Sequence, residues 1–474
     1  MVATATRPHR LSLPRPGWAE HDAESVWWAD LVALCRELLV DGRADRLRGV
    51  CVSGVGPVLL AADADGRPLR PAILYGIDAR AGREIEELDD ELGAEAILAR
   101  GGSPLTSQAV GPKLLWLRRN EPEVWERTEL LLMASSFAVR RLTGEYVLDH
   151  HSASQCDPLY DIRELGWIEE WAERIAPGLE LPRLLWPGEV AGTVDDEAAA
   201  ATGIPAGTPV AAGTVDAWAE ALGAGVSVPG QTMLMYGSTM FFVQPIDAPA
   251  PTGRLWCTVG VEPGTWSLAG GMATSGSVTD WLRGVTGLDF GELQDGARES
   301  PPGADGLLML PYFAGERTPY FDPRARGVIA GLTLAHTRGD LFRAALEATA
   351  YGVRQHLELF AELGAEPAEL TAVGGGTAGG LWTQIVSDVT GREQVLPAVP
   401  IGAAYGDALL AARAVGLAAP GEGWASAAAV IEPVPATRPV YDRIYREYQH
   451  LYRSSVETMH ALADLQDMAS PKDF

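Results

Sequence analysis

The stretch Pro209–Val243, PVAAGTVDAWAEALGAGVSVPGQTMLMYGSTMFFV, determines how the rest of the chain is interpreted. It predicts an apolar strand that ends at an acid, Asp216, followed by a small-residue helix through Ala224. A turn at Val228-Pro229-Gly230 leads into a second apolar strand, which ends in Tyr236-Gly237-Ser238-Thr239 before a third apolar run. A strand, a Gly-Ser-Thr turn and a further strand predict a tight hairpin.

This stretch offers two chemical groups at the ends of predicted strands. A carboxylate at the C-terminal end of a strand, opening a helix, is a common position for a functional acid, so Asp216 is a candidate base. The backbone N–H groups and hydroxyls of a tight Gly-Ser-Thr turn are suited to hold phosphate oxygens. A helix cap at Asp216 and an ordinary hairpin at Gly237–Thr239 are the alternative interpretation of the same residues.

Composition limits the classes of function. A chain of 474 residues should form two or three domains, and 47% hydrophobic with 21% charged residues is typical of a globular protein. The formal charge of −26 argues against a nucleic acid or an anionic membrane as partner, because both need basic surfaces. The lysines are Lys113 and Lys472, and neither lies in the Gly-Lys-Ser/Thr context of a Walker A loop.

Cysteine and histidine spacing argues against a metal or redox site. The four cysteines never form a CxxC pair, which predicts buried thiols in a cytoplasmic protein. His150 and His151 are adjacent, so their side chains point in different directions on a helix or a strand and do not chelate one ion. No apolar run reaches the length of a membrane span, and the N-terminus shows no apolar signal-peptide segment.

Two further apolar runs predict strands in the first half, Gly49–Val55 and Ala72–Ile77. The second ends in Tyr75-Gly76-Ile77-Asp78-Ala79-Arg80. An aromatic ring, an acid and an arginine at one strand end suit a ligand with many hydroxyls. A structural Asp78–Arg80 ion pair, with Asp78 capping the next helix, is the alternative, and spacing alone favours it.

The second half repeats the order of strand, hairpin and crossover, so we expect two architecturally similar halves, each a mixed sheet with crossover helices, with ligands in the cleft between them. Its strand Leu370–Val373 runs into Gly374-Gly375-Gly376-Thr377-Ala378-Gly379, which satisfies GxGxxG. A dinucleotide site would also need an acid after the next strand, QVLPAV, which has none. We therefore reject NAD and expect a backbone that approaches a flat ligand or a phosphate. Glycines needed only for close strand–helix packing are the alternative.

An ordered set of motifs resembles the FGGY family of carbohydrate kinases, within the actin/hexokinase-like ATPase superfamily. The set comprises PGWAEHD (16–22), PAILYGIDAR (71–80), AAGTVDA (211–217), YGSTM (236–240), GSVTDWLRG (276–284), GERTP (315–319), RGVIAGLTLAH (326–336), GGGTAGG (374–380) and GAAYGDALLAA (402–412). The likeness covers most of the chain and stands in family order, so the ordered set carries the argument rather than any one motif.

The resemblance implies an α/β protein of two actin/hexokinase-like (ribonuclease H-like) domains, at 1–226 and 227–474, closing on ATP and a sugar or polyol. It implies that Asp216 accepts the proton of the attacking hydroxyl and helps to place Mg²⁺. Tyr75 would stack on the sugar, while Asp78 and Arg80 would hydrogen-bond its hydroxyls. The residues implied for ATP are Gly237, Ser238, Thr239, Gly276, Gly375, Gly376, Thr377 and Ala378. A homodimer is a candidate assembly.

Two departures from the family pattern affect the interpretation. The family opens with a hairpin bearing Asp-x-Gly-Thr-Thr/Ser, the first phosphate loop, and nothing before Arg7 supplies it. We therefore expect Met1 to be an internal methionine of a longer chain, and domain one to lack two strands. Where xylulokinases have Met-His and glycerol kinases have Arg-Glu, this chain has Gly56-Pro57. A ketopentose such as xylulose is thus only the first guess. A binding protein without turnover and a truncated kinase remain alternatives.

Overall fold

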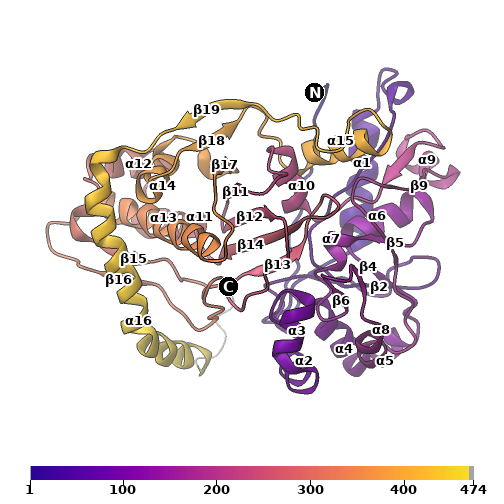
Figure 1. Ribbon diagram of the computed structural model, residues 1–474, viewed down its shortest axis with the longest axis horizontal. Coiled ribbons are helices and arrows are strands. Elements are labelled where there is room, and N and C mark those ends of the chain that lie inside the picture. The colour runs from indigo at the N-terminus through magenta and orange to yellow at the C-terminus, as the bar shows by residue number, and fades with distance from the viewer. Residues whose placement is uncertain (1, 469–474) are drawn as a thin grey trace. The chain divides into compact units, whose positions relative to one another are not determined.

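A computed structural model describes residues 2–468, so Lys472 lies outside the described range. The chain divides into two compact units (Figure 1). Unit 1 comprises residues up to 227 together with 247–267 and 401–424, and unit 2 comprises 228–246, 268–400 and residues from 425 onward. The chain first passes from unit 1 to unit 2 between Ser227 and Val228, next to the predicted domain boundary at 226/227. The units differ from two contiguous domains because two later segments pack with unit 1.

Unit 2 is built on a sheet with the strand order β14-β12-β11-β17-β18-β19. Strands β11 and β12 form the predicted antiparallel hairpin, in which Tyr236 pairs with Met240. Strand β17 lies parallel to β11 on its other side, with Met235 opposite Val373. The strands of unit 2 are β11 (Gln231–Tyr236), β12 (Met240–Ile246), β14 (Trp266–Met272), β15 (Leu308–Leu310), β16 (Val328–Ala330), β17 (Glu369–Val373), β18 (Gln394–Pro397) and β19 (Ala427–Ile431).

The long helix α13 is the centre of the helical layer of unit 2 and packs on α12 and α14 (Figure 1). It begins at a capping box in which the Thr337 and Asp340 side chains each accept the other's backbone N–H. A Cβ on Gly339 would lie 2.4 Å from the Gly296 carbonyl oxygen, so α12 and α13 cross closely there. The helices of unit 2 are α11 (Gly276–Thr286), α12 (Phe290–Glu299), η4 (Ala304–Gly306), α13 (Arg338–Glu362), η5 (Gly375–Thr377), α14 (Leu381–Thr390), η6 (Pro435–Thr437) and α16 (Arg438–Met468).

Unit 1 contains short strands joined by many helices. Its strands are β1 (Glu20–His21), β2 (Leu60–Ala62), β3 (Ala72–Ile73), β4 (Leu130–Leu132), β5 (Val147–Asp149), β6 (Tyr160–Asp161), β7 (Gly166–Trp167), β8 (Arg183–Leu185), β9 (Val190–Thr193), β10 (Pro209–Ala211) and β13 (Trp256–Val259). Its helices are η1 (Ala23–Trp28), α1 (Ala29–Leu38), η2 (Ala44–Arg46), α2 (Gly82–Leu88), η3 (Asp89–Gly93), α3 (Ala94–Gly101), α4 (Val110–Asn120), α5 (Pro122–Trp125), α6 (Ala134–Thr143), α7 (His150–Ala153), α8 (Glu169–Ile175), α9 (Asp196–Thr202), α10 (Asp216–Gly223) and α15 (Ala403–Ala414). No helix among the described residues is long and apolar enough to cross a lipid bilayer.

The prediction of similar sheets in the two halves was wrong for the described part of unit 1. Most of its strands pair in twos, and the strand predicted over Gly49–Val55 makes only two isolated parallel bridges, Val50 with Val210 and Gly54 with Val215. The strand predicted over Ala72–Ile77 is only Ala72–Ile73. Close approach is one physical reason for the first difference, because a Cβ on Gly54 would lie 2.6 Å from that of Ala134.

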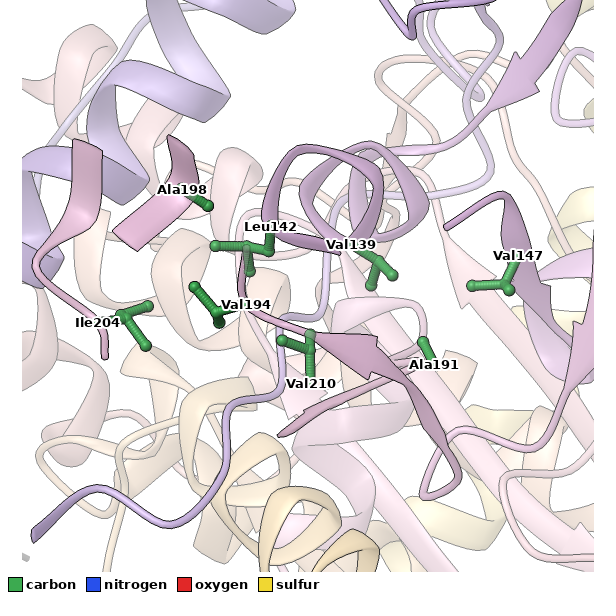
Figure 2. Close-up of a cluster of buried hydrophobic side chains, with 8 residues drawn as sticks. All are labelled: Val139, Leu142, Val147, Ala191, Val194, Ala198, Ile204 and Val210. Carbon is green, nitrogen blue, oxygen red and sulfur yellow. The ribbon is translucent and has the colours of Figure 1, made fainter. Parts of the chain in front are cut away.

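A buried aliphatic cluster fixes the elements around α6 in unit 1. Figure 2 shows Val139 and Leu142 of α6 facing side chains from β5, β9, α9 and β10. Its members are Val139, Leu142, Val147, Ala191, Val194, Ala198, Ile204 and Val210. Because β10 lies in this cluster and α10 follows it, apolar packing fixes the chain just before Asp216.

Helices α10 and α15 of unit 1 cross without intervening side chains. A Cβ on Gly406 would lie 1.8 Å from the Ala219 carbonyl oxygen, and one on Gly223 would lie 2.7 Å from the Gly406 amide. Only glycine fits such a close approach. Because Asp407 follows Gly406 on α15, the crossing also places Asp407 near α10.

We expect Gly406→Ala to lower the free energy of unfolding by about 1–3 kcal/mol, because the new methyl group forces the two helices apart. Urea unfolding followed by tryptophan fluorescence measures the change. Gly82→Ala is the matched control, because nothing lies within 4 Å of the added Cβ, and it should change stability by less than about 0.5 kcal/mol. Equal effects of the two substitutions would contradict the close crossing.

Candidate functional site

A cavity of about 460 Å³ opens in unit 2 at the carboxyl ends of β11 and β17. Its lining includes Gly237 and Ser238 of the hairpin, Gly276 at the start of α11, and Gly375, Gly376 and Ala378 of the second glycine loop. Parallel pairing explains why the two loops meet, because strands in register end at the same edge of the sheet. The structure therefore brings six of the eight predicted ATP residues together.

The second loop turns sharply against the first. Gly374 has φ +92°, and a Cβ there would lie 2.6 Å from the Tyr236 carbonyl oxygen. A Cβ on Gly376 would lie 2.7 Å from the Trp382 ring. Gly374 is thus required by the approach of the Tyr236 backbone and Gly376 by the approach of the Trp382 ring, whereas a Cβ on Gly375 would meet no atom within 4 Å.

The start of α11 clamps the hairpin turn. The Gly276 amide donates to the Gly237 carbonyl (3.0 Å), and the Ser275 and Ser277 amides donate to the Ser238 carbonyl (2.9 and 3.1 Å). The Ser275 and Ser277 hydroxyls donate to the same two carbonyls, each over 3.0 Å. The turn's carbonyl groups are therefore committed to α11.

The amides of the two loops remain available. In the described part of the chain, no hydrogen-bond acceptor is found for the amides of Ser238, Thr239, Gly375 or Gly376. A group of unpaired N–H groups beside a helix N-terminus is a site for an anion. Thr239 and Thr377 do not line the cavity, and the Thr377 hydroxyl donates to the Gly374 carbonyl over 2.8 Å.

The rest of the cavity wall is mainly apolar and was not foreseen from the sequence. Trp382 is fixed by a 2.8 Å hydrogen bond from its Nε1 to the Thr349 hydroxyl and by an edge contact with Tyr236. An apolar wall with a few polar groups suits a flat heterocycle. The additional lining residues are Tyr236, Thr279, Asp280, Phe290, Gln294, Phe342, Leu346, Leu381 and Trp382. The capping box formed by Asp289 and Glu292 is a sequence signal from which the start of α12 could have been predicted.

Asp216 is the first residue of α10 in unit 1, as the sequence predicted. Its amide donates to the Gly54 carbonyl (2.9 Å), and its carboxylate accepts the Ala217 amide (2.7 Å). Burial raises the pKa of Asp216 to about 7; the Ala217 hydrogen bond opposes this shift, and the negative charges of Glu220 and Asp407 add to it. The carboxyl is therefore poised to exchange a proton near neutral pH.

Asp407 on α15 is a second acid that sequence reasoning missed. Its Oδ2 accepts the Ser53 hydroxyl (2.7 Å) and the Ser53 amide (3.1 Å). Burial raises the pKa of Asp407 to about 6. Because Ser53 precedes Gly54, Asp407 holds the segment to which the Asp216 amide is bound. The GAAYGDALLAA helix contained this acid, but nothing in its spacing pointed to Ser53.

Asp78 and Arg80 lie in a buried ionic cluster of unit 1. The Arg80 guanidinium donates to Asp78 Oδ2 over 2.7 Å, and both side chains are 0% exposed. Asp78 also accepts the Ala19 amide (2.7 Å), while Arg80 pairs with Glu20 and stacks on Trp18 at 3.9 Å. The structural ion pair that spacing favoured is present, and Arg80 Nη1 is left without an acceptor among the described residues.

The turn after Tyr75 is held by the loop at Ser107. The Ser107 hydroxyl donates to the Gly76 carbonyl (3.0 Å), and Lys113 Nζ donates to the Ser107 carbonyl (2.6 Å). Burial lowers the pKa of Lys113 to about 7. This buried lysine was also missed, because a single lysine in an amphipathic helix carries no sequence signal.

The two adjacent histidines have separate partners in unit 1. His150 Nδ1 lies 2.7 Å from the Tyr160 hydroxyl, and His151 Nδ1 lies 2.7 Å from the Val259 carbonyl oxygen. Among residues 2–468, no group of three or more His, Cys, Asp or Glu side chains is arranged to hold a metal ion.

Comparison with known proteins identifies the chain's relatives. Residues 1–223 match the model of the N-terminal domain of the FGGY family of carbohydrate kinases, and 232–415 match that of its C-terminal domain. Xylulose kinase of Escherichia coli (strain K12) is 31% identical over 426 residues, which cover 88% of this chain and 86% of that protein. Glycerol kinase of Nocardia farcinica is 31% identical over 441 residues, covering 88% and 86%. The crystal structure of xylulose kinase from Rhodospirillum rubrum has a TM-score of 0.88 at 36% identity and covers 97% of this chain and 95% of that one.

The raised pKa of Asp216 predicts a pH-dependent stability. An acid whose pKa is higher in the folded protein than the ordinary value of 3.8 destabilises the fold progressively as pH rises from about 4 to about 7. Asp216→Asn should therefore be close to the wild type in stability at about pH 4, and more stable by up to about 4 kcal/mol at about pH 8, since one pKa unit corresponds to about 1.36 kcal/mol. Urea unfolding across this range measures the difference. The exposed Asp247→Asn is the control for the loss of one negative charge, and a pH-independent difference at Asp216 would refute the shift.

Proposed function

Because the chain belongs to the FGGY family of carbohydrate kinases, which are phosphotransferases with an alcohol group as acceptor, we propose that it transfers the γ-phosphoryl group of ATP to a hydroxyl of a sugar or polyol. The observation that carries this proposal is the cavity of unit 2, where two glycine loops meet at the ends of parallel strands. A ketopentose such as xylulose is the first candidate for the acceptor.

The proposed nucleotide site uses the backbone more than side chains. The unpaired amides of Ser238, Thr239, Gly375 and Gly376 would hold phosphate oxygens by hydrogen bonds, without a P-loop lysine. Gly276 allows α11 to approach the turn, and the first amides of α11 hold the turn's carbonyl groups, so that the free Ser238 and Thr239 amides can face the phosphates. The apolar wall near Ala378 and Trp382 would contain the adenine, and the Thr377 hydroxyl keeps the second loop folded.

Asp216 is the proposed general base. Its pKa of about 7 lets it accept the proton of the attacking hydroxyl at neutral pH. It is held by the bond from its own amide to the Gly54 carbonyl and by the bond from the Ala217 amide to its carboxylate. One carboxylate, completed by water and phosphate oxygens, is also a usual environment for Mg²⁺, so the residues fit an ion that binds together with ATP. When bound, Mg²⁺ would neutralise part of the negative charge of the phosphates.

Tyr75, Asp78 and Arg80 are the proposed sugar residues, with roles refined by their contacts. Asp78 has its oxygens engaged by Arg80 and by the Ala19 amide, so we propose that it orients Arg80 rather than binding the sugar directly. Arg80 Nη1 is buried and has no acceptor among the described residues, so we propose that it donates to a sugar hydroxyl once substrate binding uncovers it. Tyr75, half-buried beside the Ser107 loop, would stack on the ring face.

The acceptor is best identified by turnover. We expect ADP release with Mg-ATP and at least one member of a panel of ketopentoses, aldoses and polyols, and loss of at least about a thousand-fold in kcat for Asp216→Asn. The panel is needed because Gly56-Pro57 offers no side-chain hydrogen bond to a sugar and because xylulose and glycerol kinases are equally similar in identity. Tight binding of ATP or a sugar by calorimetry, without turnover of any panel member, would instead favour a binding protein.

Filling the cavity tests the nucleotide site separately. Gly375→Leu places a side chain in open space at the cavity wall, so the fold should be retained while the affinity for Mg-ADP falls by at least about ten-fold. Calorimetric titration with Mg-ADP measures the affinity, and the melting temperature reports the fold. Gly253→Leu, at another open glycine, is the control and should bind as the wild type does. Unchanged affinity in Gly375→Leu would place the nucleotide elsewhere.

A further inference from the structure

The loop Gly315-Glu316-Arg317-Thr318-Pro319 has no role in the function proposed above, although it is polar and largely buried in unit 2. Glu316 is 5% exposed and Thr318 is 0% exposed. A polar loop is buried in this way only when its groups are hydrogen-bonded, so its partners indicate what it does.

Glu316 binds the end of β14. Its carboxyl Oε1 accepts the Ala273 amide over 2.7 Å and the Arg317 amide over 2.8 Å. The backbone of Glu316 pairs with that of Asp322 in both directions, at 2.8 and 2.9 Å. The Asp322 carboxylate in turn accepts the Tyr452 hydroxyl (3.0 Å) and lies 2.8 Å from His460 Nε2, both on α16. The loop is therefore anchored to the C-terminal helix.

Thr318 binds the same strand two residues earlier. Its hydroxyl accepts the Gly271 amide over 2.6 Å and lies 2.8 Å from His356 Nε2 of α13. The Thr318 amide donates to the Gly271 carbonyl over 3.2 Å. Residues 271 and 273 are thus held at alternate positions along one edge.

The residues that follow Ala273 lead to Gly276, which lines the cavity. The Thr274 hydroxyl donates to the Pro311 carbonyl, and Ser275, Gly276 and Ser277 clamp the carbonyls of Gly237 and Ser238. The bond from the Ala273 amide to Glu316, directly after β14, is therefore the last contact with the GERTP loop before the chain reaches Ser275–Ser277. A shift of this anchor would move Gly276 and, through it, the hairpin turn.

We infer that Glu316 is a positioning residue for the nucleotide cavity: its bond to the Ala273 amide fixes the segment 273–277, which orients the unpaired amides of the Gly237–Thr239 turn. The inference rests on the proposed function, because it assigns Glu316 to the site proposed for ATP. Removing the carboxyl leaves the Ala273 and Arg317 amides buried without an acceptor, which favours a rearranged segment.

The acceptor oxygen, rather than the charge, is what this position requires. Burial raises the pKa of Glu316 to about 8, against the opposing effect of the two amide hydrogen bonds and of Arg317. The side chain is therefore mostly a neutral acid at pH 7, and glutamine reproduces its shape and its acceptor. Glu316→Gln should retain the anchor, whereas Glu316→Ala should lose it.

The test compares Mg-ADP affinity by calorimetry in the wild type, Glu316→Ala, Glu316→Gln and Gln244→Ala. Gln244 is the matched control, because it is a buried side chain of unit 2 that donates to the Ala365 carbonyl (2.7 Å) and accepts the Thr232 hydroxyl (2.9 Å) away from the cavity lining. We expect Glu316→Ala to weaken binding by about ten-fold and the other two variants to stay within about two-fold. In steady-state assays the KM for ATP should rise in Glu316→Ala, with kcat and the KM for the sugar nearly unchanged.

Hydrogen–deuterium exchange without nucleotide gives a second readout. Peptides covering residues 273–278 should exchange faster in Glu316→Ala than in Glu316→Gln or Gln244→Ala. Unchanged affinity and exchange in Glu316→Ala would overturn the inference, as would equal loss of affinity in Gln244→Ala, which would indicate general destabilisation. A wild type that binds no ADP would overturn the proposed function together with the inference, whereas normal wild-type binding with an unaffected Glu316→Ala would overturn the inference alone.

Discussion

The parallel pairing of β11 with β17 is the constraint on which the candidate site of unit 2 depends. Met235 lies opposite Val373, so the two strands end level with each other and their glycine turns meet. A one-residue slip of this register would separate Ser238 from Gly376 and turn the strand side chains to the opposite face. Three further features depend on this pairing: the hydrogen bonds from the start of α11, the close approach of Gly374 to Tyr236, and the fixed position of the Trp382 ring.

The sequence predicted the unit 2 framework well, because its elements have strong local signals. The hairpin around Gly237-Ser238-Thr239 and the glycine loop after Val373 were placed within a residue or two of their observed bounds, as was the helix of unit 1 that begins at Asp216. Unit 1 was predicted less well, since the apolar run Gly49–Val55 indicates a strand, whereas close contact at Gly54 and isolated bridges leave it irregular. Periodicity reports the preference of a segment, and it cannot report whether a partner strand lies alongside along its whole length.

The side-chain networks could not be predicted, because the separation of their partners follows no rule: it is 6 residues for Lys113 and Ser107 and 354 residues for Asp407 and Ser53. Asp407 holds Ser53, Lys113 holds Ser107, and Glu316 holds Ala273. Each partner is an ordinary residue with no spacing rule. Each network also buries an ionisable group with a pKa moved toward neutrality, by desolvation above all. Burying these groups costs stability, and each of them holds a backbone segment near a candidate site.

The discontinuity of unit 1 has a consequence for how the protein is made. Residues 401–424 pack with unit 1 although they follow most of unit 2 in the chain, and they include α15, which covers α10 at Gly406 and supplies Asp407. During synthesis from the N-terminus, the ribosome has therefore released nearly the whole chain before unit 1 acquires its final helix. Until then the face of α10 that α15 later covers, from Ala219 to Gly223, lacks its partner, so unit 1 completes its packing only after most of unit 2 has been synthesised.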